Sequence, residues 1–193
     1  AYVQKYCTDQ RVCVIKLDVI NGVGGAMVMG YQQALEDGHD ILVKVDGDGQ
    51  MNPTLILKLI TPILEKKAEY AKGNRFHKIA TVIVMPKSRI FGNVCLSFLS
   101  KISSGYWSVF DPTNGFTALH RTAAKRLSFE RIAKGYFFES DILFHLGMIR
   151  AAVQDVPMEA IYGSEVSGIN IPKVIPEFIV KHFFNTCKRV YFN

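Results

Sequence analysis

The sequence has few cysteines and no long apolar run, and each absence removes a class of protein. Its four cysteines form no Cys-x-x-Cys pair and have no histidine at the spacing of zinc ligands. We therefore expect free thiols and neither disulfides nor a zinc site. No stretch of about 20 consecutive apolar residues and no secretory signal pattern occur, so no transmembrane helix is predicted for this chain.

Acidic residues are also scarce relative to basic ones. The chain carries 17 Asp and Glu against 23 Lys and Arg, which gives a formal net charge of +6. This balance indicates an anionic partner, such as a phosphate compound or a membrane surface. No stretch resembles a DNA- or RNA-binding module, so we do not expect nucleic acid. The length of 193 residues and the apolar content of 49% predict one globular domain with a substantial core.

The most informative stretch is a pair of aspartates one residue apart. The apolar run 41–45 predicts a buried strand, and it ends at Asp46 and Asp48, each followed by glycine. Two neighbouring carboxylates repel each other unless a cation binds them. Hard oxygen ligands suit Mg²⁺ or Mn²⁺, and Gln50 can add a further oxygen. The alternative is an ordinary Asp-Gly turn before a helix that begins at Pro53.

A glycine-containing turn precedes these aspartates. Residues 12–17 are apolar and β-branched, which predicts a strand. A turn with Gly22 and Gly24 then leads into apolar residues at helical spacing from 26 to 35. A strand, a glycine-rich turn and a helix also occur in dinucleotide-binding enzymes that need no metal. Because the spacing differs from Gly-x-Gly-x-x-Gly, we rank that interpretation lower.

Basic side chains stand at the boundaries of two further predicted elements. A short strand from residue 70 ends at Arg75, which is either a surface arginine or a phosphate ligand. Ser88 and Arg89 begin a mostly apolar helix that continues to Gly105. Ser88 also suits the N-cap of that helix, which needs no ligand as an explanation.

A second acidic site follows a polar turn in the last third of the chain. Asn114 and Gly115 form a turn that enters a predicted strand, 116–120. Glu139 and Asp141 then lie beside three aromatic residues at the start of a predicted helix. Acids are favoured at a helix N-terminus by the helix dipole alone, but carboxylates among aromatics are also candidate bases. Residues two apart point about 200° apart on a helix, so one of the two acids faces the site.

The C-terminal segment 172–193 differs in character from the rest. Aromatic and aliphatic residues alternate with lysine, arginine and histidine, and Glu177 is its one acidic residue. This composition predicts a basic amphipathic helix at an anionic membrane surface, and the alternative is a helix docked on the domain. A polar loop at 162–167 precedes it and is a candidate to close over a bound donor.

Together these motifs resemble those of one enzyme family. Asp46-x-Asp48-x-Gln50 at a strand end resembles the metal and nucleotide-sugar motif of the GT-A glycosyltransferases. The longer pattern is similar to the dolichol-phosphate mannosyltransferase branch of glycosyltransferase family 2. The resemblance covers about residues 21 to 192 in separate pieces.

The resemblance implies a role for each motif. Ser88 and Arg89 match the stretch that approaches the acceptor phosphate, and Asp141 aligns best with the family's acid. Related processive enzymes use an adjacent acid pair, so Glu139 is kept as a second catalytic candidate. The positions implied to contact the donor are Gly22, Gly24, Asp46, Arg75, Asn114 and Gly115.

The implied fold is α/β, with a GT-A domain over residues 1–171 that has a Rossmann-like, mostly parallel sheet and helices on both faces. The family has earlier strands that hold the nucleotide base, so we expect residues before Ala1. The implied reaction is inverting, metal-dependent transfer of a hexose from a nucleotide diphosphate sugar to a polyprenyl phosphate or a glycan. We expect it at the cytoplasmic face of a membrane. The alternative is a non-catalytic module that binds nucleotide sugar or phospholipid there.

Overall fold

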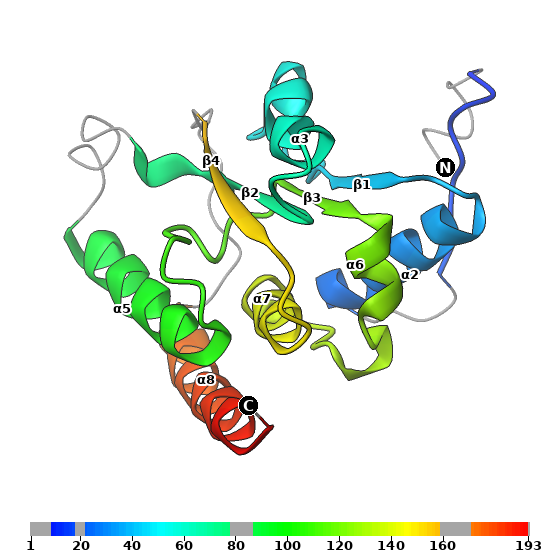
Figure 1. Cartoon of the computed structure of the whole chain (residues 1–193). Helices are drawn as coiled ribbons and strands as arrows, with labels where there is room; N and C mark the ends of the chain where they lie inside the picture. Colours follow the sequence, from blue (N-terminus) through cyan, green and yellow to red (C-terminus); the bar gives the residue numbers. More distant parts are fainter. Residues whose placement is uncertain (1–8, 18–21, 78–86, 159–170, 193) are drawn as a thin grey trace.

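A four-stranded sheet forms the centre of the fold (Figure 1). The structure, a computed structural model, describes residues 9–17, 22–77, 87–158 and 171–192, without the side chains of 87–91 and 171–174. In the order β1-β3-β2-β4, the sheet contains β1 (Ile41–Lys44), β3 (Thr117–His120), β2 (Tyr70–Asn74) and β4 (Val153–Pro157). β3 is antiparallel to both neighbours, whereas β2 and β4 are parallel.

Strand direction decides where polar groups gather. Since β3 opposes both β1 and β2, the strands β1, β2 and β4 share one direction. The described sheet is nevertheless mixed rather than mostly parallel, because two of its three strand pairings are antiparallel. The carboxyl ends of β1, β2 and β4 lie at one edge of the sheet, and β3 enters the sheet from that same edge. In open α/β sheets this is the edge at which ligands bind.

Helices cover both faces of the sheet, as predicted. On one face α3 packs Leu59 and Ile63 against Ala71 and Ala118 of the central strands. The other face carries α2, α6 and α7 around Tyr70, and Figure 1 shows α3 opposite them. The described helices are α2 (Gly22–Glu36), α3 (Ile56–Leu64), α5 (Lys87–Ser104), α6 (Arg121–Arg126), α7 (Phe138–Met148) and α8 (Ile171–Phe192).

The first turn of α2 lies against the segment that leads into α7. The Gly25 amide donates to the Lys134 carbonyl over 3.1 Å. A side chain at Gly24 would overlap the Ala133 carbonyl and the Phe138 ring, so only glycine allows this approach. Gly22 adopts a φ of +71° beside the Lys134 carbonyl. The glycines of the predicted turn thus pack two helices closely.

Helices α5 and α8 lie side by side beneath the sheet layer (Figure 1). The inner face of α8 has apolar and polar contacts. Phe178 packs against Phe137 with 5.0 Å between ring centroids, His182 Nδ1 is 2.8 Å from Ser103 Oγ of α5, and Asn185 donates to Asp141 of α7 over 2.7 Å. The exposed side chains of α8 include the charged Glu177 and Lys188 as well as apolar ones, namely Ile179, Val180, Phe183, Phe184, Val190, Tyr191 and Phe192. Among the described helices, none is long and apolar enough to cross a membrane.

One predicted element is wrong. Residues 12–17 form no strand, and residues 12–16 are exposed. An apolar β-branched run forms a strand only when another strand supplies hydrogen bonds, and the described residues offer this one none. Two other predictions are confirmed. Asn52 caps the helical segment that begins at Pro53, since its Oδ1 accepts from the Thr54 amide at 3.0 Å, and β4 is an edge strand of the sheet. The predicted loop 162–167 lies outside the described residues.

The cysteines in the described part of the chain have free thiols, as predicted. Cys13, Cys95 and Cys187 are free and exposed.

Candidate active site

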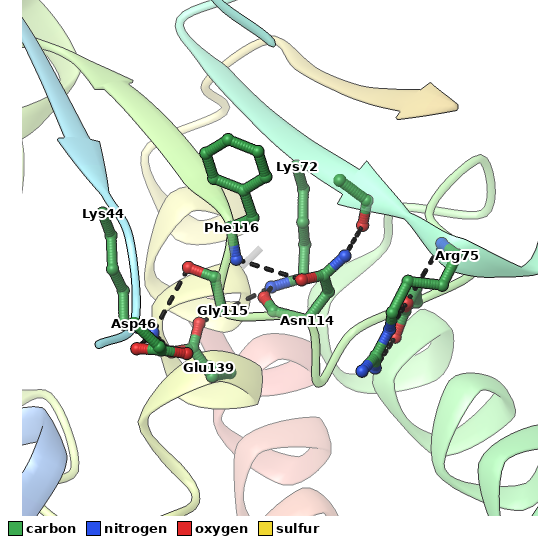
Figure 2. A network of polar contacts seen from close by, with 10 residues as sticks. Lys44, Asp46, Lys72, Arg75, Asn114, Gly115, Phe116 and Glu139 are labelled. Atoms are coloured by element: carbon green, nitrogen blue, oxygen red, sulfur yellow. Dashed lines mark hydrogen bonds and ion pairs between the residues drawn. The ribbon is translucent and has the colours of Figure 1, made fainter. Parts of the chain in front are cut away.

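Four segments bring polar side chains together at the carboxyl edge of the sheet (Figure 2). Lys44 and Asp46 come from the end of β1, and Lys72 comes from β2. The turn 114–116 leads into β3, and Glu139 lies in the first turn of α7. Figure 2 shows these side chains pointing toward one another as one network.

Asp46 lies between this network and the solvent. Its side chain is 37% exposed, and Oδ1 is 2.6 Å from the Lys44 ammonium. Asp48 is exposed, and its Oδ1 accepts from the Gln50 amide over 3.0 Å, which closes the Asp-Gly-Asp turn. Gly49 has a φ of +75°, a conformation that glycine adopts without strain. The two aspartates predicted to bind metal thus remain accessible at the sheet edge.

Lys44 is buried beneath Asp46 and has three oxygen partners. Besides Asp46, its ammonium lies 2.9 Å from Glu139 Oε1 and donates to the Gly115 carbonyl over 3.2 Å. Burial acts to lower the pKa of Lys44, but the neighbouring carboxylates outweigh burial and raise that pKa above its usual value. Lys44 therefore stays charged and links β1, α7 and the turn before β3.

Lys72 is the second buried lysine of the network. Its ammonium donates to the Asn114 carbonyl over 2.5 Å and lies 3.6 Å from Glu139 Oε2, an ion-pair distance too long for a hydrogen bond. Burial lowers the pKa of Lys72, and Glu139 and Asp111 offset part of that effect. Glu139 is thus shared between two ammonium groups.

The turn at Asn114 and Gly115 is held from several sides. The Asn114 amide donates to the Gly73 carbonyl over 2.7 Å and accepts from the Phe116 amide at 3.0 Å. A side chain at Gly115 would overlap the Asp46 carboxylate and the Lys44 ammonium. A larger residue at position 115 would therefore displace the ends of both side chains.

Arg75 has a buried partner next to this turn. Its Nε and Nη2 lie 2.7 and 2.9 Å from the two oxygens of Asp111, which is fully buried. This bidentate pair ties the end of β2 to the start of the segment 111–116. The contact gives Arg75 a positioning role in addition to the donor contact implied by resemblance, which stays a prediction.

The two candidate acids occupy different surroundings. Glu139 joins the network through Lys44 and Lys72. Asp141 is buried elsewhere: its Oδ2 accepts from the Ala133 amide over 2.8 Å, and its Oδ1 accepts from Asn185 of α8. Of the pair, Glu139 shares a cation with Asp46, and the catalytic role that the resemblance implies for Asp141 stays a prediction.

The remaining predicted site residues either lie away from this network or have side chains outside the described part of the structure. Gly22 and Gly24 contact the segment 133–138 that precedes and begins α7. Ser88 and Arg89 belong to the first turn of α5, but their side chains lie outside the described residues.

Sequence analysis missed Lys44 and Lys72. Each interrupts an otherwise apolar strand, and a charged residue inside a buried strand requires a partner. That interruption was the signal that could have revealed them.

Comparison with known proteins identifies the family. The profile described as glycosyl transferase family 2 matches residues 1–128 of the chain. The chain belongs to glycosyl transferase family 2. Among family relatives, UDP-N-acetylglucosamine–dolichyl-phosphate N-acetylglucosaminyltransferase of Methanococcus voltae is 36% identical over 152 residues, 79% of this chain and 60% of that protein. Undecaprenyl-phosphate mannosyltransferase of Micrococcus luteus is 27% identical over 151 residues, 78% of this chain and 61% of that protein.

A solved structure agrees with this family 2 fold. Glucosyl-3-phosphoglycerate synthase from Mycobacterium tuberculosis, solved with Mn²⁺, UDP and glucosyl-3-phosphoglycerate, matches with a TM-score of 0.62 and 18% identity. The match covers 92% of this chain and 57% of that one, and at this identity it shows the fold alone. The predicted GT-A fold is thus confirmed. The chain spans about three fifths of the length of the curated relatives it matches.

Proposed function

We propose that this protein transfers a hexose from a nucleotide diphosphate sugar to a polyprenyl phosphate. The observation that carries the proposal is the accessible pair Asp46 and Asp48 at the carboxyl edge of the sheet, next to a network that holds the surrounding turns. Membership of family 2 and the names of the two relatives that act on lipid phosphates support it.

The donor end of the site fits a divalent metal. The described residues contain no group of three or more His, Cys, Asp and Glu side chains suited to a metal. In this proposal the protein supplies Asp46, Asp48 and the Gln50 oxygen, and the donor and water supply the rest, which is how Mg²⁺ commonly binds. Mg²⁺ or Mn²⁺ in this place would supply positive charge to the diphosphate leaving group.

Substitution of Asp48 tests the metal role directly. Because Asp48 is exposed, Asp48→Ala should leave the fold intact and reduce Mn²⁺-dependent binding of nucleotide sugar at least about 10-fold, as changes at metal sites do. Calorimetric titration of a panel of nucleotide sugars, with and without Mn²⁺, measures this. Asp37→Ala, another exposed aspartate, is the matched control. Equal affinity in Asp48→Ala and the control would remove the metal role.

The acceptor follows from proton chemistry. A sugar hydroxyl needs a general base within hydrogen-bond reach, whereas a lipid phosphate is already anionic. Both oxygens of Asp141 accept hydrogen bonds from groups of the fold, and Glu139 is shared by two ammonium groups. These contacts favour the phosphate, since they give each acid a structural partner.

Two substitutions separate the phosphate acceptor from a hydroxyl acceptor. Arg89→Ala should strongly reduce transfer to polyprenyl phosphate, because the resemblance places Arg89 at the acceptor phosphate. Asp141→Asn should reduce transfer only partly, and the pH profile should lack the acidic limb of an essential base. Loss of all turnover in Asp141→Asn, together with transfer to a soluble glycan, would establish a hydroxyl acceptor instead.

The mechanism that we propose is inverting, by one in-line displacement at the anomeric carbon. Proton NMR of the first product formed gives its anomeric configuration and tests this point. Donor binding without any turnover would favour the alternative, a non-catalytic module that binds nucleotide sugar or phospholipid.

We further propose that α8 lies on the cytoplasmic surface of an anionic membrane. Its exposed residues Phe183, Phe184 and Tyr191 are large and apolar, and Lys181 and Lys188 lie among them. Each cation near such a surface contributes about 1 kcal/mol. Sedimentation with phosphatidylserine vesicles at low and high salt tests this, and no binding at low salt would leave α8 as a packing element.

A further inference from the structure

The first turn of α7 carries Glu139, whose carboxylate points into the strand-end network (Figure 2). Its Oε1 is 2.9 Å from the Lys44 ammonium, and its Oε2 is 3.6 Å from that of Lys72. The N-cap position of this helix is Phe137, whose side chain supplies no capping hydrogen bond. A helix end without a side-chain cap depends on tertiary contacts to stay in place. The position of Glu139 therefore depends on the elements that pack against this turn.

Helix α8 packs against the turn through the ring of Phe137. This ring makes edge-on contacts with the rings of Phe178 and His182, at centroid distances of 5.0 and 4.9 Å. All three rings are buried. The Lys181 ammonium also lies 5.3 Å from the centroid of the Phe137 ring. Because edge-on aromatic pairs have a preferred geometry, these contacts fix the orientation of the turn as well as its distance from α8.

A second contact attaches α8 to the same turn at Asp141. Asn185 of α8 donates to Asp141 Oδ1 over 2.7 Å. Phe137 and Asp141 are four residues apart, so they lie on one face of the turn, and Glu139, midway between them, points to the opposite side. Helix α8 thus holds one face of the turn, and the opposite face directs Glu139 toward the two lysines.

We propose that Phe178 and Asn185 of α8 are positioning residues that hold the first turn of α7 and so keep Glu139 between Lys44 and Lys72. Glu139 matters for the reaction because the proposed function, on which this inference rests, places the reaction at this network. Helix α8 then has a role in the site that is separate from the membrane contact proposed for its exposed side chains.

The titration of Lys72 reports where Glu139 lies. Burial lowers the pKa of Lys72, and Glu139 is the strongest of the groups that raise it again. When Glu139 moves away, the titration midpoint of Lys72 should fall by about one pH unit, the usual effect of losing a nearby opposite charge. The measurement is the ¹³Cε NMR signal of Lys72 in lysine-labelled protein without substrate, assigned by its absence in Lys72→Arg. Glu139→Gln sets the full size of the change.

Phe178→Ala removes one ring from Phe137 and should lower the Lys72 midpoint by most of the change seen in Glu139→Gln. Phe178→Leu keeps most of the apolar contact and should restore the midpoint. Asn185→Ala should lower it by less than Phe178→Ala does, and it decides the question if Phe178→Ala does not fold. The control is Arg189→Met, which removes a contact of α8 with Ile102 of α5 and should leave the midpoint unchanged.

Transfer activity is the second readout, measured in detergent with polyprenyl phosphate and the nucleotide sugar that the titration panel identifies. Phe178→Ala should lower kcat/KM at least about 10-fold, since a small misplacement of a group at the site costs that much or more. Phe178→Leu should recover most of the loss. Arg189→Met should match the unchanged protein at a temperature at which both are folded, which separates positioning from a general loss of stability.

The outcomes separate this inference from the proposed function. If the Lys72 midpoint moves in Glu139→Gln but in neither Phe178→Ala nor Asn185→Ala, α8 does not position Glu139 and the inference is wrong. An unchanged midpoint in Glu139→Gln would also overturn it, because Glu139 would then not face Lys72. If Lys72 responds as expected but the unchanged protein transfers no sugar, the proposed function fails and the placement of Glu139 by α8 stands.

Discussion

The strand-end network and the α5–α8 layer both bury polar groups, but they bury them in different states. At the strand ends the buried groups are ionisable: Lys44 and Lys72 share Glu139, and Lys44 also pairs with Asp46. Between α5 and α8 the buried polar pair is neutral, with His182 against Ser103, and Arg189 of α8 donates to the Ile102 carbonyl where the contact is only partly buried. Burial lowers the pKa of His182 to about 4, and the charge of Asp141 offsets this only partly, so His182 is neutral at pH 7.

The two regions also differ in the side chains that they expose to solvent. The ion network directs a carboxylate, Asp46, toward solvent, whereas the polar contacts of α8 occupy its inner face and leave apolar rings exposed. Fixed charges suit a site that must hold a charged ligand in one geometry. Helix α8 is attached through Phe178, His182 and Asn185, which leaves its other large apolar residues exposed.

The largest expected effect is on the charged side of this comparison. Arg75→Ala leaves Asp111 fully buried without its bidentate partner, so we expect a loss of about 3–5 kcal/mol in the free energy of unfolding. Urea denaturation measures it. In a double-mutant cycle with Asp111→Asn, the combined loss should be smaller than the sum of the single losses. Additive losses would mean that the pair does not hold the end of β2.

The neutral side should respond to pH. Because His182 has a folded pKa of about 4 and an unfolded pKa near 6.5, the unfolded state takes up a proton first as the pH falls below 6.5. Stability is then lost between pH 6.5 and 4, by roughly 3 kcal/mol in total.

Asp155 works against this trend, since burial raises its pKa to about 6 and the folded state takes up that proton first. The quantity to measure is therefore the stability of the unchanged protein minus that of His182→Gln, at pH 7 and pH 4.5, in which Asp155 cancels. A difference that does not change with pH would show that His182 is not held neutral.

Gly115→Ala tests how tightly the ionic site is packed. The added methyl group would overlap Asp46 and Lys44, so we expect a loss of about 1–3 kcal/mol in stability and weaker binding of Mn²⁺ with nucleotide. Gly30→Ala in α2, where a methyl group meets nothing within 4 Å, is the control and should be neutral or slightly stabilising. Equal behaviour of the two variants in calorimetry would mean that the turn adjusts freely.

The smallest effects compare the two faces of α8. Asn185→Ala removes the donor from buried Asp141 Oδ1 and should cost about 1–2 kcal/mol. Phe184→Ser, on the exposed face, should change stability by less than about 0.5 kcal/mol but reduce vesicle binding. A large loss of stability in Phe184→Ser would place the apolar face in contact with the domain.

Local sequence patterns were enough for most elements and for the aspartate pair. The strand before Asp46, the cap at Asn52 and the edge position of β4 depend on neighbouring residues and on periodicity, which a sequence displays directly. The segment 12–17 failed because a strand also depends on a partner, and partners are set by the whole fold.

The partners of the two lysines could not be derived in the same way. Lys44 is tolerated in a buried strand only because Glu139 and Gly115 reach it from far along the chain. Helical geometry predicted that Glu139 and Asp141 point in different directions, but it could not tell which of them faces the strand-end network. The contacts show that Glu139 faces it and that Asp141 faces α8. Likewise, the composition of α8 predicted an amphipathic helix, and only the contacts of Phe178, His182 and Asn185 establish which residues face the domain.

The antiparallel strand β3 has a consequence for how the protein is made. Its pairing with β1 joins Lys44 to residue 117, and the pairing of β2 with β4 joins Asn74 to Pro157. Contacts so distant in sequence form slowly, because long loops must close before they gain any stabilisation. On a ribosome, Lys44 and Lys72 would emerge long before Glu139 and would remain hydrated until it arrives. The site is therefore assembled late, and a chain released before β4 would have a β2 that lacks its parallel partner and can pair with other chains.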